Sequence, residues 1–130
     1  MKTDQEQANE ALEAVRQLWQ RYADISPQQL EVYGKPAKRI LEAIGKTQEY
    51  LAEVNRWQKR DIEKEGDIAR FWFIISAEIG LVDPFLSQLC IDIAGFIANQ
   101  AENKTNSTQF DDNYKAFFFL IHHAEWKGMA

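Results

Sequence analysis

The sequence predicts an all-α fold, namely a compact antiparallel helical bundle of four long helices plus one short helix. Three observations carry this prediction. Apolar residues recur three and four positions apart through most of the chain, capping residues and prolines mark the starts of successive segments, and the alternation typical of strands is absent. Because 130 residues is a usual length for one domain, we expect a single domain over residues 1–130.

The first helix is expected over residues 4–24. Thr3 and Glu6 have the spacing of a capping box, in which the threonine oxygen accepts from a backbone N–H and the glutamate reaches back. A second box begins at Ser26, with proline at the first helical position, and predicts a short helix that ends near Gly34. The apolar stripe of the first helix is Ala8, Ala11, Leu12, Val15, Leu18, Trp19, Tyr22 and Ile25.

The longest periodic segment begins at Pro36 and predicts a continuous helix to Glu65, closed by Gly66. Its apolar stripe fades after Trp57, and residues 58–65 are almost all charged, so we expect a solvated helix end there. At 1.5 Å per residue such a helix is about 45 Å long, so its Trp57 end is expected to extend past its neighbours. The stripe is Ile40, Ile44, Thr47, Leu51 and Val54.

Three more segments follow. Asp67 is expected to cap a helix that is apolar nearly all round, which places that helix in the middle of the bundle or in an interface. Asp83, followed by proline, is expected to cap the next one. The expected ranges are 67–82, 84–101 and 111–127, with a polar loop over 102–110. The stripe of the middle range is Leu86, Leu89, Cys90, Ile93, Phe96 and Ile97.

Charge and composition argue against several functional classes. Fifteen Lys and Arg against twenty Asp and Glu leave a net charge of −5, which argues against a general nucleic-acid binder. The single Cys90 excludes an intrachain disulfide framework and a cysteine-based zinc site. No uncharged run exceeds nine residues, whereas a membrane-spanning helix needs about twenty. We therefore expect a cytoplasmic protein without a membrane or nucleic-acid partner.

Candidate catalytic and metal-binding residues are few. His122 and His123 are adjacent, so on a helix they point about 100° apart and cannot easily bind one metal together. Glu78 lies on a mostly apolar helix and is expected to pair with Arg70 or to face a partner. Whether Glu78, His122 and Glu125 converge in a cleft stays open. No nucleophile, phosphate-loop or metalloprotease motif is present, so we expect no enzyme activity, no metal and no cofactor.

Two segments are candidate protein interfaces. A basic helix end surrounds Trp57, although a solvated charged face is the other interpretation of it. The apolar run at residues 117–121 covers the whole circumference of a helix, so it is either fully buried or exposed on one side to a partner. The residues expected at such a contact are Trp57, Arg56, Arg60, Phe117, Phe118 and Ile121.

The predicted function is a non-enzymatic helical protein–protein interaction module of the inhibitor, immunity, adaptor or chaperone type. It would bind a protein partner, a second copy of itself, or both. The alternative is a bundle that binds a small apolar ligand or cofactor in its aromatic core, which requires a cavity of several hundred cubic ångströms. A third possibility is a small helical enzyme that uses Glu78, His122 or Glu125.

Overall fold

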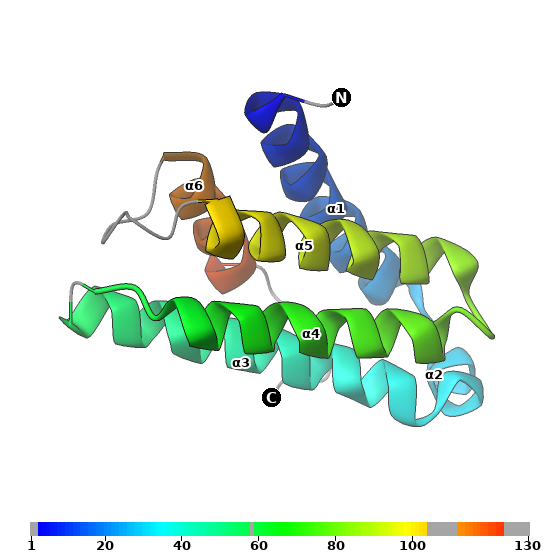
Figure 1. Cartoon of the computed structure of the whole chain (residues 1–130). Coiled ribbons are helices and arrows are strands. Elements are labelled where there is room, and N and C mark those ends of the chain that lie inside the picture. Colours follow the sequence, from blue (N-terminus) through cyan, green and yellow to red (C-terminus); the bar gives the residue numbers. More distant parts are fainter. Residues whose placement is uncertain (1–2, 58, 104–111, 124–130) are drawn as a thin grey trace.

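The computed structural model describes residues 3–57, 59–103 and 112–123, and within them the chain forms six α-helices and no strand (Figure 1). The predicted all-α bundle is confirmed. It has five long helices and one short one rather than four and one, because each of the six periodic segments forms its own helix. Among the described helices, none is both long and apolar enough to cross a bilayer. The helices are α1 (Asp4–Asp24), α2 (Pro27–Tyr33), α3 (Lys35–Trp57), α4 (Ile62–Ile79), α5 (Pro84–Asn103) and α6 (Asp112–His123).

The helix α4 and the helix α5 form an antiparallel hairpin, which lies toward the viewer in Figure 1. The helix α3 runs alongside α4, and α1 crosses α5 at an angle. The helix α6 contacts both α1 and α3. The core lies where these helices meet, and it includes most of the predicted stripes of α1, α3 and α5. Trp19 of the α1 stripe is exposed, and the side chain of Tyr22 lies outside the described residues.

The predicted helix starts are confirmed at both capping boxes. The Glu6 N–H donates to Thr3 Oγ1 over 3.1 Å, and the Gln29 N–H donates to Ser26 Oγ over 3.2 Å. Gln29 completes its box by accepting the Ser26 N–H over 2.9 Å. The short helix α2 ends before Gly34, whose φ of 64° lies in the left-handed region that glycine adopts at low cost.

The α4–α5 hairpin is closely packed near its turn. The Ser87 hydroxyl donates to the Ser76 carbonyl oxygen over 2.7 Å, which joins the two helices directly. A Cβ added at Gly80 would lie 3.2 Å from both the Ser76 carbonyl oxygen and Ser87 Oγ. Glycine therefore permits this close approach, and the hairpin leaves the turn little room to move.

The prediction of one continuous helix from Pro36 to Glu65 is wrong. The helix α3 ends at Trp57, and α4 begins at Ile62 with Asp61 as its N-cap, which accepts the Lys64 N–H over 3.1 Å. The expected solvated end at residues 58–65 is confirmed for Lys59, Asp61, Glu63 and Lys64, which are exposed. It is wrong for Arg60 and Glu65, whose side chains are buried. The helix α3 has 23 residues, so it is about 35 Å long and not the expected 45 Å.

The helix predicted over 67–82 corresponds to α4, which begins earlier, at Ile62, and ends at Ile79. Gly66 and Asp67 are therefore interior positions of α4 and do not separate two helices. The last helix, predicted over 111–127, is described over Asp112–His123. Most of the predicted loop at 102–110 lies outside the described residues, as does residue 58.

Candidate functional site

The C-terminal residues expected at an interface lie in the core instead. Phe117, Phe118 and Ile121 are buried, so their assignment to a surface contact is wrong. Phe118 lies 4.7 Å from the ring of Tyr114, and Phe117 lies 5.2 Å from the ring of Phe96, measured between ring centroids. The first contact lies within α6, whereas Phe96 belongs to α5, and the ring of Phe118 also lies 5.9 Å from that of Tyr50 in α3. One side of α6 therefore packs against α5 and α3, which sequence periodicity could not decide for a helix that is apolar all round.

The second group of expected interface residues also changes. Arg60 is buried and forms an ion pair with Glu65, so it is not part of a basic surface. Arg56 is exposed in the last turn of α3. Trp57 is the last residue of α3, and its side chain lies outside the described residues. Of the two arginines expected at this helix end, Arg56 is therefore at the surface and Arg60 is not.

Buried polar residues cluster around Glu65. Arg60 Nε donates to Glu65 Oε2 over 2.9 Å, and Arg60 Nη2 donates to Glu65 Oε1. The Tyr114 hydroxyl donates to Oε1 over 3.1 Å, and the Tyr50 hydroxyl donates to Oε2. Burial, followed by the hydrogen bond to Glu65, raises the pKa of Tyr50, and burial raises the pKa of Tyr114 well above its ordinary value.

This cluster is built to join helices. Four donors occupy the lone-pair sites of Glu65, so the carboxylate has no position left from which to take a proton from a substrate. Tyr50 also accepts the Asp61 N–H over 3.0 Å at the start of α4, and Tyr114 belongs to α6. The arrangement therefore connects α3, α4 and α6 through one buried carboxylate.

The other candidate chemical residues are paired or buried. Glu78 forms an ion pair with Arg39 of α3, whereas Arg70, the partner suggested by the sequence, pairs with Asp67. Cys90 is buried in the core, and burial raises the pKa of its thiol to about 12. The side chains of His122 and Glu125 lie outside the described residues, so their predicted convergence with Glu78 does as well. The described residues contain no group of three or more potential metal ligands.

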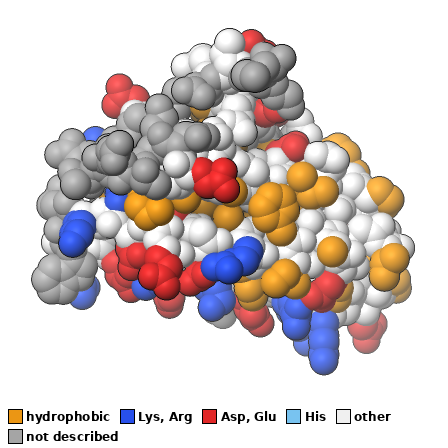
Figure 2. All heavy atoms as spheres, viewed as in Figure 1, with side chains coloured by type: hydrophobic (Ala, Val, Ile, Leu, Met, Phe, Trp, Pro, Cys, Tyr) orange, Lys and Arg blue, Asp and Glu red, His pale blue; other side chains and the backbone are white. Residues whose placement is uncertain are grey.

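Exposed apolar side chains gather on the α4–α5 hairpin. Figure 2, in which α4 and α5 lie toward the viewer, shows hydrophobic side chains over the middle and right of this face. Leu81, at the turn, is 90% exposed. We call this surface the α4–α5 face. Its members are Phe73, Ile74, Leu81, Val82, Phe85 and Ile91.

The exposed side of α4 changes character along its length. Its first half carries charged residues, including Glu63, Lys64, Asp67 and Arg70. From Phe73 to the end of α4 the exposed positions are apolar, namely Phe73, Ile74 and Ala77, and Leu81 follows in the turn. Glu78 is partly exposed there and pairs with Arg39. The apolar surface is therefore confined to the end of the hairpin nearest the turn.

The turn of the hairpin is anchored by Asp83, which is buried. Its Oδ1 accepts the Leu86 N–H over 3.0 Å and caps α5, and its Oδ2 accepts from the Tyr33 hydroxyl over 2.8 Å and from Arg21 Nη2 over 2.9 Å. Burial alone would raise the pKa of Asp83, but these hydrogen bonds and the charge of Arg21 outweigh it and lower the pKa. Asp83 thus ties the turn to α1 through Arg21 and to α2 through Tyr33.

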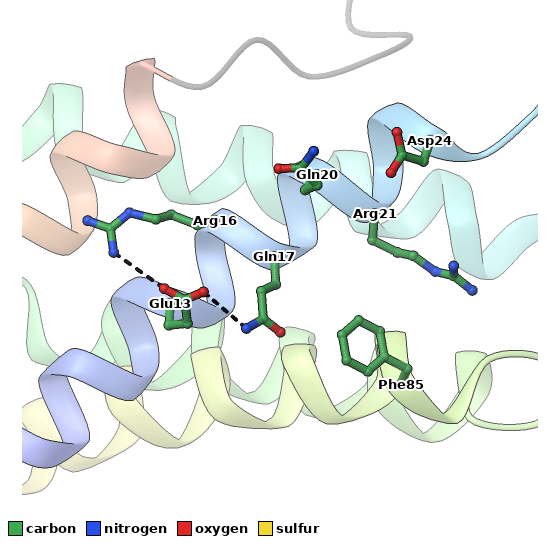
Figure 3. Close-up of a pocket in the computed structure, with 7 residues that line it drawn as sticks. All are labelled: Glu13, Arg16, Gln17, Gln20, Arg21, Asp24 and Phe85. Carbon is green, nitrogen blue, oxygen red and sulfur yellow. Dashed lines mark hydrogen bonds and ion pairs between the residues drawn. The ribbon is translucent and has the colours of Figure 1, made fainter.

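A groove of about 370 Å³ continues the surface from Phe85 toward α1. In Figure 3 the ring of Phe85 lies below Gln17 and Arg21, which α1 contributes. Glu13 lies in the same wall, where it pairs with Arg16 over 3.6 Å. The groove therefore brings one exposed apolar side chain, Phe85, next to polar and charged side chains of α1.

Sequence reasoning found this surface only in part. It placed the helix at 67–82 either in the middle of the bundle or in an interface. The helix α4 has one buried side, which includes Trp72 and Ile75, and one exposed apolar side, which includes Phe73 and Ile74. The signal was the surplus of apolar residues around α4. Comparison with known proteins adds nothing to this assignment, since no family model, no curated protein and no solved structure matches the chain.

Proposed function

We propose that this chain is a non-enzymatic protein-interaction module that docks a protein on the α4–α5 face. The observation that carries the proposal is the set of six large apolar side chains exposed on one hairpin. Two of the six are phenylalanines, which present roughly 150–250 Å² each, and the exposed fractions of all six run from 38% to 90%, so together they expose on the order of 500 Å². Patches of that size on a single chain are often functional.

The energetic consequence supports docking. Removing about 500 Å² of apolar surface from water contributes on the order of 10 kcal/mol. Association itself costs an estimated 4–15 kcal/mol, so the face alone supports binding only when polar contacts at its rim add to it. The groove beside Phe85, with Arg16 and Gln17 in its wall, supplies such a rim.

The alternative, a small apolar ligand in the aromatic core, has less support. The rings of Phe96, Tyr114, Phe117 and Phe118 contact one another at centroid distances of 4.7–6.3 Å. The surface pockets beside Phe85, Arg60 and Phe71 are not lined by Phe96, Phe117 or Phe118. Inhibitors, immunity proteins, adaptors and chaperones all bind other proteins, and identifying the partner would show which of these roles applies. The lone, buried Cys90 fits a cytoplasmic setting.

The test compares a face variant with a matched control on the same helix. Ile74→Asp replaces an exposed apolar residue of the face, and Glu63→Gln alters the charged half of α4. Tagged parent and variants are cross-linked in an extract of the native host, and the products are quantified by mass spectrometry. We expect a defined product, formed with another protein or with a second copy, that Ile74→Asp abolishes and Glu63→Gln preserves. The proposal fails if no such product forms or if Ile74→Asp leaves it unchanged.

A further inference from the structure

The net charge of the chain is concentrated on two neighbouring helices. The helix α1 carries five carboxylates and two arginines, and α5 carries two carboxylates and no lysine or arginine. Together they hold a net charge of −5, which equals that of the whole chain, so the remaining residues balance to zero. The surplus charge that attracts or repels a partner therefore belongs to α1 and α5.

The helix α1 packs against α5 in the antiparallel direction and borders the α4–α5 face. Near one end of the contact, Asn99 of α5 donates to Gln7 of α1 over 2.6 Å. Near the other end, Phe85 of α5 shares a groove with Gln17 of α1. Because Phe85 is also a member of the α4–α5 face, the acidic pair of helices and the apolar surface meet at this residue.

Asp92 carries a negative charge at the edge of the apolar residues. It follows Ile91, a member of the face, and it accepts from Gln88 Nε2 over 3.0 Å. None of the ion pairs between described residues includes Asp92. A neutral amide does not cancel the charge of a carboxylate, so Asp92 can still receive a cation from a partner.

The arginines of α1 do not reverse the charge of this border. Arg21 donates to the buried Asp83, and Arg16 lies 3.6 Å from Glu13. Each arginine is therefore matched by a carboxylate of its own chain. The surplus that remains on α1 is negative.

The side of the face next to α3 differs from the side next to α1. There Glu78 of α4 pairs with Arg39 of α3, so the two charges cancel. From Phe71 to Asn103 the chain has no lysine or arginine that could balance the carboxylates of α5. The apolar face thus has a neutral pair on one side and two acidic helices on the other.

From this asymmetry we infer that the occupant of the α4–α5 face is a basic amphipathic segment of the partner protein. Its apolar residues cover the face, and its lysines or arginines lie over α1 and α5. The inference rests on the proposed function and names the chemistry of the partner. Two proteins that meet in a stable interface arrange their charges so that a negative surface faces a positive one.

The area of the face also favours a single segment over a whole folded surface. An interface of standard size covers about 800 Å² on each partner, whereas the six apolar side chains expose on the order of 500 Å². One amphipathic helix that lays its apolar side on a hydrophobic surface needs less area than two folded domains do. Opposite charges at the border then raise the association rate and fix the orientation of the segment.

The probe is a synthetic peptide of about 18 residues, made of leucine and lysine spaced so that the leucines form one side of a helix. Fluorescence anisotropy at pH 7 and about 20 mM salt measures its binding to the full chain. We expect saturable binding that is at least tenfold tighter than that of the same peptide with glutamate in place of lysine. Because salt screens exposed charges, binding should weaken at least threefold at about 300 mM salt. Equal binding of the two peptides would overturn the inference.

Charge reversal separates the local charge of the border from the overall charge of the protein. Glu13→Lys/Asp92→Lys should weaken binding of the lysine peptide at least tenfold. Glu49→Lys/Glu63→Lys changes the overall charge by the same amount at exposed positions of α3 and α4, and should change binding less than threefold. Circular dichroism of both double variants checks that the helices remain. Equal weakening by the two would mean that the peptide responds only to net charge, and the inference would then be wrong.

A further pair of variants tests whether the apolar side of the peptide lies on the α4–α5 face. Phe85 is 53% exposed and adjoins α1, so Phe85→Ala should weaken binding at least threefold. Phe119 is 63% exposed on α6, outside the face, so Phe119→Ala should leave binding within about twofold. If Phe85→Ala has no larger effect than Phe119→Ala, the peptide binds elsewhere and the inference is wrong.

Cross-linking in an extract of the native host separates this inference from the proposed function. Glu13→Lys/Asp92→Lys should abolish the same product that Ile74→Asp abolishes. If Ile74→Asp abolishes the product and the double variant leaves it unchanged, the basic partner is wrong and the docking function stands. If no product forms, or if Ile74→Asp leaves it unchanged, the docking function fails and the inference fails with it.

Discussion

Arg60 and Glu65 form an ion pair inside the protein, with relative side-chain exposures of 2% and 0%. Arg60 lies in the connection between α3 and α4, and Glu65 lies in the first turns of α4. If one straight helix ran from α3 into α4, residues 58–65 would lie in water, as the sequence suggested. Instead, α3 ends at Trp57 and α4 begins at Ile62, and the two opposite charges are buried together with Tyr50 and Tyr114.

Removing the cation from this pair should be costly. We expect Arg60→Leu to lower the free energy of unfolding by about 3–5 kcal/mol, because Glu65 is then buried without its counter-charge. Arg70→Leu removes one partner of an exposed pair with Asp67 and should cost less than about 1 kcal/mol. Urea denaturation of both variants measures the difference. Equal losses in the two variants would show that the buried pair contributes nothing special.

Replacing both members of the pair should be tolerated better than replacing one. The double variant Arg60→Leu/Glu65→Leu leaves no unpaired buried charge, so it should recover at least about 1 kcal/mol relative to Arg60→Leu alone. The remaining loss comes from the hydroxyls of Tyr50 and Tyr114, which then lose the hydrogen bond to Glu65. Urea denaturation of the double variant checks this. A double variant less stable than Arg60→Leu would contradict it.

The stability supplied by Asp83 should depend on pH. Its pKa is lower in the folded chain than its ordinary value of 3.8, so the carboxylate stabilises the fold above that value, and this stabilisation is lost as the pH falls through the lower, folded pKa. Asp83→Asn should therefore destabilise the protein at pH 7, and the difference from the parent should shrink below about pH 4. Urea titrations at several pH values measure it. A difference that is constant or larger at low pH would contradict the assignment.

Adjacent phenylalanines in α6 should respond very differently to truncation. Phe118 is 1% exposed, so Phe118→Ala should cost about 3–5 kcal/mol, whereas Phe119 is 63% exposed and Phe119→Ala should cost less than about 1 kcal/mol. Thermal or urea unfolding of the two variants tests the orientation of α6. Similar losses for both would mean that this helix is rotated relative to the core.

The thiol of Cys90 should be inert in the native protein. It is buried, and burial raises its pKa to about 12, so very little thiolate exists at pH 8. We expect labelling by an aromatic disulfide reagent to be slow in buffer and at least a hundredfold faster in urea above the unfolding midpoint. Rapid stoichiometric labelling without denaturant would contradict this.

The sequence by itself determined which segments are helical and where most of them begin. Thr3 and Ser26 mark the starts of α1 and α2 through capping boxes that depend only on residues within one turn. Asp83 marks the start of α5 as its N-cap. The stripes of α1, α3 and α5 have one apolar side, so periodicity also identified most of what they bury, although Trp19 of α1 is exposed. Caps and apolar stripes depend on residues close together in the chain, so they can be identified from the sequence.

Tertiary structure decided what local pattern leaves open. The helices α4 and α6 are apolar nearly all round, so only the positions of their neighbours determine that Phe73 is exposed and that Phe118 is buried. The charged residues after Trp57 looked solvated because the partners of Arg60 and Glu65 come from distant parts of the chain, namely Tyr50 of α3 and Tyr114 of α6. Burying a charge is favourable only where such partners assemble, and their assembly is a property of the folded chain.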